Sequence, residues 1–215
     1  MRTRFHEDLE QLAVLLEQMC LRDRDAIAMA TDALLNADIE QAERAIDLCA
    51  RVAGMGEECE ESAVMLLALQ APVASELRRV VTALQLSGNL ARMGGLCAHL
   101  AELVRRRHPD PVIPDSLRDI VARMGAAAVQ MAGDAARVLA TGDAEGAAGL
   151  DAEDDVMDGL HRDLLNAVLG PEFYDGAPTA VDLALLGRYY ERFADHTVEV
   201  GRRTVFMTTG AVLPE

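Results

Sequence analysis

The sequence is poor in aromatic residues and has no apolar run of membrane length. Phe, Trp and Tyr make up 3% of the 215 residues and Trp is absent, while 51% are hydrophobic. Abundant Ala, Leu and Met favour closely packed helices over a β-sandwich, whose strands prefer aromatic and β-branched residues. No run of about 18 apolar residues occurs, so we expect no membrane span.

Cysteines are few and show no metal-binding or redox spacing. No two of them form a C-x-x-C pair, and all four lie in helical patterns, where a Cys usually packs as a small hydrophobe. A chain of this size does not depend on disulfides, which favours a reducing compartment. No charged leader with a cleavage site opens the chain. The sequence therefore predicts a cytoplasmic protein.

Basic residues are outnumbered by acidic ones. The chain has 20 Lys and Arg against 36 Asp and Glu, a formal net charge of −16. Such a surface repels nucleic acid and anionic lipid, and it suits cations or basic protein partners. We therefore expect no nucleic-acid partner. The P-loop, the GxGxxG phosphate cradle and the G-x-S-x-G motif of serine hydrolases are also missing.

Apolar periodicity and turn residues predict six helices. Breaks at 36–38 and 141–143 each end in an Asp that can cap the helix that follows. Pro72 ends the second helix, and Ser75 is the predicted cap of the third. The predicted helices cover about 2–35, 38–70, 75–107, 116–140, 143–169 and 179–208.

A proline-rich stretch separates two halves of similar design. Three prolines fall between His108 and Asp115, so this stretch cannot be helical and is predicted to be an extended linker. We place a domain boundary here, with residues 1–108 and 109–215 each forming an up-down-up bundle. The sequence thus predicts an all-α fold of two tandem, pseudo-symmetric three-helix bundles, with six long antiparallel helices.

The two halves repeat one another with a period near 100 residues. On the last predicted helix, apolar side chains recur at alternating steps of four and three, which marks one face of an amphipathic helix. The same stripe occurs 100 residues earlier, as expected of two similar modules in tandem. The stripes are Leu86, Leu90, Met93, Cys97, Leu100 and Val104, and Leu186, Tyr190, Phe193, Thr197, Val200 and Thr204.

Two acidic pairs distinguish the second half. Asp154 and Asp158 are four residues apart, as are Glu191 and Asp195, so each pair shares one helix face. Both pairs lie about 20 Å from the turn that joins their helices, hence at one level. Four carboxylates at one level repel one another unless a cation neutralises them, and hard oxygen donors suit Mg²⁺, Mn²⁺, Ca²⁺ or iron. We predict a divalent or trivalent metal ion here (Mg, Mn, Fe or Zn), with His196, one position off the shared face, as an added nitrogen donor.

The alternative interpretation is a solvated acidic face without a ligand. Arg188 and Arg192 lie beside the second pair and can form surface ion pairs, each of which contributes little to stability. In the first half no comparable site is expected, because one thiol and three positions without a ligating side chain replace the carboxylates. These positions are Cys49, Ala53, Ala91 and Gly95.

At these residues the chain resembles the PhoU family, the phosphate-transport accessory proteins and phosphate-response regulators of bacteria. The markers are APVASELR over 71–78, the D-x-x-x-D that starts at Asp154, and RYYERFADH over 188–196. The last is similar to the family signature R-x-x-E-R-I-G-D-H. The order of six helices adds to the match, and the chain as a whole is similar to actinobacterial members.

The resemblance implies a regulator and not an enzyme. Such a protein couples the high-affinity phosphate ABC transporter, through contact with its ATPase subunit, to a phosphate-sensing histidine kinase, and it thus reaches a membrane only indirectly, through partners. It negatively regulates phosphate uptake and the phosphate-starvation response, and a metal site is implied at each E/D-x-x-x-D motif. We also expect a homodimer. Two alternatives stay open: a di-metal carboxylate enzyme, whose sites use Glu-x-x-His pairs that are not found at these motifs, and a ligand-free helical scaffold.

Overall fold

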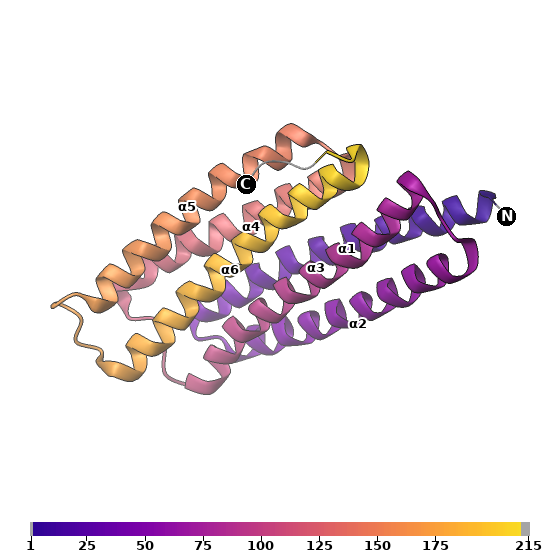
Figure 1. Ribbon diagram of the computed structural model, residues 1–215. Coiled ribbons are helices and arrows are strands. Elements are labelled where there is room, and N and C mark those ends of the chain that lie inside the picture. Colours follow the sequence, from indigo (N-terminus) through magenta and orange to yellow (C-terminus); the bar gives the residue numbers. More distant parts are fainter. Residues whose placement is uncertain (1, 212–215) are drawn as a thin grey trace.

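The computed structural model describes residues 2–211, with side chains from Arg4 onward. The predicted first bundle includes residue 1 and the predicted second bundle includes residues 212–215, and these residues lie outside the described range. Within it the chain is all-α, in two bundles of three helices, which confirms the predicted fold class (Figure 1). None of these helices is long and apolar enough to cross a lipid bilayer. The elements are α1 (Arg2–Asn36), α2 (Ile39–Gln70), α3 (Ala74–Arg107), a 3-10 turn η1 (Asp115–Leu117), α4 (Arg118–Thr141), α5 (Ala144–Leu169) and α6 (Gly176–Thr209).

Aspartate caps fix the start of α2 and of α5. Oδ1 of Asp38 accepts a hydrogen bond from the backbone N–H of Gln41 at 3.0 Å. Oδ1 of Asp143 accepts one from the N–H of Glu145, also at 3.0 Å. Each bond satisfies a backbone donor that has no partner inside the helix. The two breaks predicted from the sequence are therefore real and equivalent.

Two predicted helix starts are wrong. Ser75 does not cap α3, because it already lies in the first turn of a helix that follows Val73 without a side-chain cap. Helix α6 begins at Gly176, not near Thr179. A proline such as Pro178 is tolerated in the first turn, where its missing N–H costs no intrahelical hydrogen bond.

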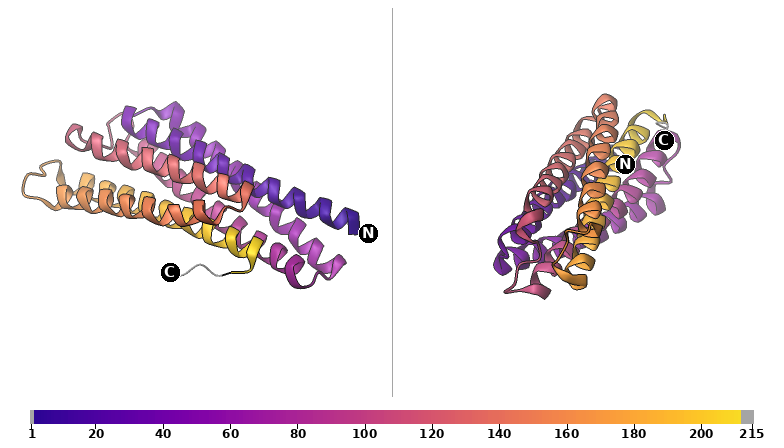
Figure 2. Two further views of the ribbon diagram at one scale, coloured as in Figure 1. Left: turned by 90° about the horizontal axis from the view of Figure 1, so that it is seen from above. Right: turned by 90° about the vertical axis from the view of Figure 1, so that its left-hand side faces the viewer.

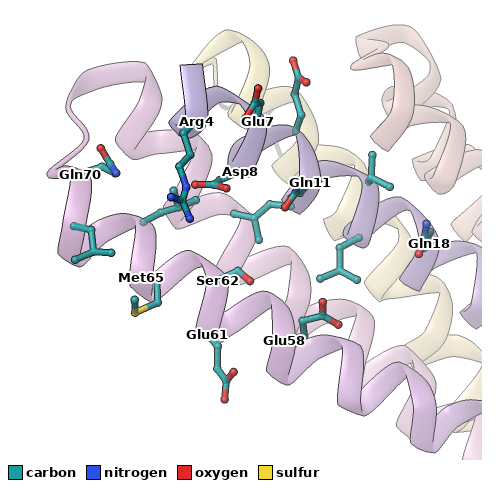
Figure 3. Close-up of a pocket in the computed structure, with 16 residues that line it drawn as sticks. Arg4, Glu7, Asp8, Gln11, Gln18, Glu58, Glu61, Ser62, Met65 and Gln70 are labelled. Carbon is teal, nitrogen blue, oxygen red and sulfur yellow. The ribbon is translucent and has the colours of Figure 1, made fainter. Parts of the chain in front are cut away.

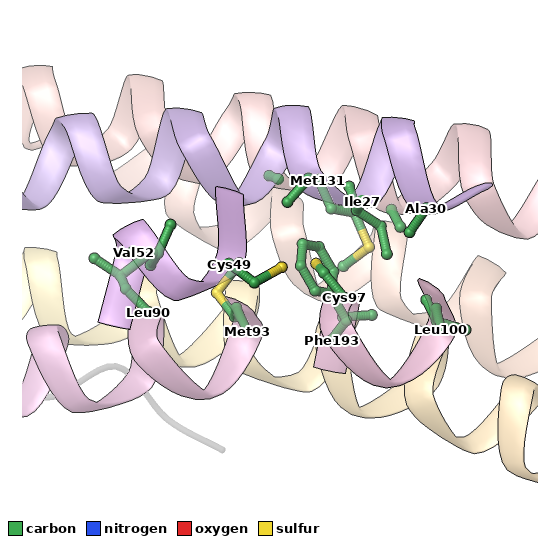
Figure 4. Packing of buried hydrophobic residues seen from close by; sticks show 14 of the residues in the cluster. Ile27, Ala30, Cys49, Val52, Leu90, Met93, Cys97, Leu100, Met131 and Phe193 are labelled. Carbon is green, nitrogen blue, oxygen red and sulfur yellow. The ribbon is translucent and has the colours of Figure 1, made fainter. Parts of the chain in front are cut away.

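Four helices form the centre of the molecule. Helix α1 packs against α4 and α3 packs against α6, while α2 and α5 cover the outer sides of their bundles (Figures 1 and 2). One apolar core runs through all six helices and across both halves. Figure 4 shows part of it, where side chains of the first half meet Met131 of α4 and Phe193 of α6. The domain boundary between residues 108 and 109 therefore stays a prediction, because the two bundles share their interior.

The shared core is also crossed by a polar contact between α1 and α6. Tyr190 is fully buried, and its hydroxyl lies 2.6 Å from the hydroxyl of Thr31. The Thr31 hydroxyl donates to the carbonyl of Ile27 at 2.7 Å, so the Tyr190 hydroxyl is the donor to Thr31. All other residues of the two predicted stripes on α3 and α6 are buried as well, which confirms the repeat at the level of packing.

An ion-pair cluster joins the end of α3 to the start of α6. Nη2 of Arg106 and Nε of Arg107 each donate to a carboxylate oxygen of Asp182 at 2.7 Å. The side chain of Asp182 is 10% exposed, while those of Arg106 and Arg107 are 58% and 28% exposed, so the carboxylate is shielded more than the two guanidinium groups. The sequence analysis did not predict this contact. The cluster ties the two halves together at one end.

Replacing Asp182 by Asn should lower the free energy of unfolding by about 1.5–3 kcal/mol, the range for hydrogen bonds to charged groups. Asn keeps the shape of the side chain but loses the charge that both guanidinium groups face. Urea unfolding at pH 7 measures the loss. Asp163→Asn, which changes an exposed carboxylate on α5, is the control. Equal unfolding free energies for the two variants would show that the cluster does not stabilise the pairing of the bundles.

Candidate functional site

The four predicted ligands lie on the adjoining sides of α5 and α6. Asp154 and Asp158 are one turn apart on α5, and Glu191 and Asp195 are one turn apart on α6. The four carboxylates are close enough that the other three all act on the ionisation of Asp154. The structure therefore brings together two pairs that the sequence separates by more than thirty residues. We call these four residues the α5–α6 carboxylate cluster.

Glycines on α6 let the two helices approach closely on both sides of the cluster. A Cβ atom at Gly187 would lie 2.9 Å from Cδ2 of His161, and one at Gly201 would lie 2.7 Å from Cδ1 of Leu150. Neither distance leaves room for a methyl group. Because Gly187 precedes the α6 pair and Gly201 follows it, the local sequence holds both acidic faces against each other.

Asp154 is the most perturbed member of the cluster. Its pKa is raised to about 6, first by burial and then by the negative charges of Asp195, Asp158 and Glu191, in that order. Its Oδ1 is buried and has no hydrogen-bond partner among the described residues. A buried carboxylate oxygen without a partner, next to like charges, is the environment that a bound cation would relieve.

Glu191 has an alternative partner in Arg188, one turn earlier on α6. The side chain of Glu191 is 16% exposed, and Nη1 of Arg188 donates to both of its carboxylate oxygens. Burial raises the pKa of Glu191, as does the charge of Asp195, while Arg188 and His161 lower it. A metal ion would thus compete with an internal cation for this carboxylate.

The predicted nitrogen donor, His196, lies where α6 faces α3. Burial lowers its pKa, and the positive charges of Arg192 and of Arg92 on α3 lower it further, against the opposing charge of Asp195. A neutral imidazole suits a metal ligand. The two guanidinium groups beside the ring, however, disfavour a cation at this point.

In the conformation seen, no group of three or more Asp, Glu, His or Cys side chains within the described part of the chain is arranged to hold a metal ion. At the α5–α6 carboxylate cluster, Glu191 is bound to Arg188, and Asp158 and Asp195 are exposed. The donor chemistry and the repulsion fit a hard cation, but the side chains would have to turn toward it. The metal site therefore stays a prediction.

The first half has no carboxylates at the equivalent surface. Ala91 and Gly95 have the same exposure as Glu191 and Asp195, so the surface is open there but offers no oxygen donors. Cys49 differs, because it is buried and its sulfur points toward that of Cys97 (Figure 4). A hydrogen bond with the Cys97 thiol lowers the pKa of Cys49. All four cysteines are free thiols.

A carboxylate that the sequence analysis missed lies inside the first half. Asp23 on α1 is 0% exposed, and neither of its side-chain oxygens has a hydrogen-bond partner in the described chain. Burial raises its pKa well above the usual range, and the neighbouring Cys49 raises it further. The signal was present in the sequence, because steps of three and four from Leu16 through Met19 place position 23 on the buried stripe of α1.

Comparison with known proteins links both halves to one family. The PhoU domain model matches the chain twice, over residues 16–104 and 121–204. The "Phosphate-specific transport system accessory protein PhoU homolog 2" of Mycobacterium tuberculosis is 46% identical over 98% of this chain and 99% of its own length. The protein named PhoU homolog 1 in Mycobacterium leprae is 45% identical over 98% of this chain and 95% of its own.

Solved structures share the arrangement of the helices. The phosphate transport system regulatory protein PhoU from Streptococcus pneumoniae superposes with a TM-score of 0.86 at 23% identity, covering 98% of this chain and 100% of that one. PhoU from Pseudomonas aeruginosa gives a TM-score of 0.85 at 21% identity, with 96% and 100% covered. At this level of identity the likeness bears on the fold alone, and it agrees with two tandem bundles.

Proposed function

Because the chain belongs to the PhoU family, and to the type found in actinobacteria, we propose that it regulates phosphate transport as an accessory protein. The observation that carries this proposal is the 46% identity to a phosphate-specific transport accessory protein over 98% of the chain. The relatives are named as accessory proteins and not as enzymes. The chain is accordingly no enzyme, and the di-metal carboxylate enzyme is set aside.

The finer proposal concerns how the regulation works. The protein acts in the cytoplasm, where it contacts the ATPase subunit of a phosphate ABC transporter and a phosphate-sensing histidine kinase. When phosphate is plentiful, these contacts hold down phosphate uptake and the starvation response. The net charge of −16 supports this proposal, since such a surface favours basic faces on its partners.

The proposal includes a cation at the α5–α6 carboxylate cluster. Asp154, Asp158, Glu191 and Asp195 would hold a divalent or trivalent metal ion (Mg, Mn, Fe or Zn), which would neutralise their charge and fix α5 against α6. The raised pKa of Asp154, caused by burial and by its acidic neighbours, supports a role for positive charge here. We assign such an ion a structural or regulatory role, because the relatives are named as accessory proteins.

Deletion of the gene tests the regulatory role. In medium with abundant phosphate, a strain that lacks this protein and any second copy of the family should express its phosphate-starvation genes. The intact gene, supplied in trans, should restore repression. If repression in high phosphate is unchanged by the deletion, the proposed role is wrong.

A further inference from the structure

The first bundle ends in a surface that the second bundle does not cover. The beginning of α1 and the turn between α2 and α3 project past the ends of α4, α5 and α6 (Figure 1 and the left view of Figure 2). Large apolar side chains are exposed at this end, as they also are on α5, on α6 and in the turn between those two helices. Those at this end include Val14 (52% exposed), Met65 (56%), Leu69 (68%) and Val73 (70%).

A groove runs along this end between α1 and α2. It is a cavity of about 1080 Å³, bounded by residues 4–18 of α1 on one side and 58–70 of α2 on the other (Figure 3). Its apolar part includes Leu12 and Leu66, which are buried, and the exposed Met65 and Leu69. Apolar surface that lies in a groove and is rimmed by polar side chains is typical of an interaction surface.

The rim of the groove is acidic. Five carboxylates line it, and Arg4 is the only basic side chain among the described residues that do so. None of the five forms an ion pair within the described chain, in contrast to the acidic residues Asp151, Asp182 and Glu191 elsewhere. The five are Glu7, Asp8, Glu10, Glu58 and Glu61. An apolar strip between uncompensated negative charges calls for an occupant with an apolar face and positive flanks.

We infer that this groove binds a basic amphipathic helix of a partner protein. At 1.5 Å per residue the α1 side of the groove is roughly 20 Å long, which matches an occupant helix of about four turns. The apolar face of that helix would lie on Leu12, Met65 and Leu66, and its Lys or Arg side chains would meet the acidic rim, as in other helix-in-groove contacts. The occupant helix would then pack against α1 and α2, as the three helices of each bundle pack against one another.

A second copy of this chain fits the groove less well. The net charge of −16 makes two copies repel each other. The most basic helical stretch, Arg105 to Arg107, already uses two of its guanidinium groups on Asp182. The occupant is therefore assigned to a different protein. The inference deepens the proposed regulatory role. It rests on that role in one respect, namely that the protein acts through contacts with other proteins.

A synthetic peptide tests the inference directly. The probe is a labelled amphipathic helix of about 16 residues, with Leu along one face and Lys along its flanks, and its fluorescence anisotropy is measured with the full-length protein. We expect saturable binding that weakens as salt rises. A peptide with every Lys changed to Glu, and one with every Leu changed to Ser, should not bind.

Matched variants on one helix locate the binding site. Glu58→Gln with Glu61→Gln removes two charges from the groove rim, and should weaken binding about tenfold at low salt. Glu57→Gln with Glu60→Gln removes two exposed charges from the same stretch of α2, outside the groove, and should change the affinity less than twofold. Met65→Ala with Leu69→Ala should also weaken binding, while circular dichroism shows the helix content of the wild type.

Three results would overturn the inference. Absence of saturable binding would show that the groove does not take a basic helix. Equal weakening by the two Glu pairs would show attraction to net charge without a site. Sedimentation of a wild-type dimer that the Met65→Ala and Leu69→Ala changes dissociate would assign the groove to a second copy. If the peptide fails to bind while gene deletion still relieves repression, the groove inference fails and the regulatory role stands. If the peptide binds at the groove while deletion leaves repression unchanged, the groove inference stands and the regulatory role fails.

Discussion

Divalent cations are expected to raise the unfolding temperature of the wild-type protein through the α5–α6 carboxylate cluster. A cation that binds only the folded chain adds RT ln(1 + [L]/Kd) to stability, about 2.7 kcal/mol at a hundredfold excess over Kd. For a chain of this length the gain corresponds to a rise of roughly 5–10 °C. Thermal unfolding of chelator-treated protein, followed by circular dichroism with Mg²⁺, Mn²⁺ or Zn²⁺ added, measures the rise.

Removal of the α6 pair should abolish that response. The Glu191→Ala and Asp195→Ala double variant loses half of the oxygen donors, so added cation should leave its unfolding temperature unchanged. Without cation, the variant should be more stable than the wild type at pH 7. The reason is that Asp154, whose pKa is raised to about 6 by burial and then by its acidic neighbours, loses two of the charges that repel it.

A change at the equivalent place in the first half is the control. Cys49→Ala lies at the position that corresponds to Asp154, and the other three equivalent positions, Ala53, Ala91 and Gly95, have no carboxylate. The cation-induced rise should therefore survive this change, even if the unfolding temperature itself falls. An equal loss of the response, or cation density beside Ala91 and Gly95 in a crystal, would show that the metal belongs to the first half.

Helix boundaries could be predicted from the sequence wherever a local chemical signal sets them. Asp38 and Asp143 cap their helices through bonds to backbone N–H groups two or three residues away, and such contacts follow from sequence spacing. The start of α3 has no such signal, since Val73 precedes it without a side-chain cap. Ser75 was chosen there by residue type alone, and the prediction was wrong.

The candidate site was predictable in its placement but not in its contacts. One turn joins α5 to α6, so helix rise alone brings the pairs of Asp154 and Glu191 to one level. The side-chain partners depend on rotamers and on other helices. Arg188 takes the Glu191 carboxylate, and Arg92 of α3 faces His196. The sequence carries no spacing rule for contacts of this kind.

Long-range charge partners were the largest omission. Asp182 meets Arg106 and Arg107, which lie 75 or more residues earlier, and only the packing of α3 on α6 brings them together. Asp23 was missed for another reason. Its position on the apolar stripe of α1 could be read from the sequence, but acidic residues are mostly exposed in folded proteins. The burial of an unpaired carboxylate departs from that tendency.

The last prediction concerns this buried carboxylate. Asp23 is 0% exposed and has no hydrogen-bond partner for either oxygen in the described chain, and burial raises its pKa well above the usual range. The unfolded chain keeps a pKa of about 3.9, so the folded state holds a proton that the unfolded state releases. Stability from this group is thus complete below about pH 4. It is lost as pH rises toward the raised pKa, by about 1.4 kcal/mol per pH unit.

Asp23→Asn should remove that pH dependence, because the amide has nearly the same shape and does not titrate. Urea unfolding of both proteins at a series of pH values from 4.5 to 7.5 measures it, and the variant should gain on the wild type as pH rises. Asp47→Asn, which changes an exposed carboxylate on α2, is the control for the loss of one negative charge and should run parallel to the wild type. A constant difference between Asp23→Asn and the wild type would mean that Asp23 is already ionised in the fold, and hence that a water molecule or ion meets its oxygens. In that case the wild type should have the higher free energy of unfolding, because the amide of Asp23→Asn would lose a partner that the carboxylate has.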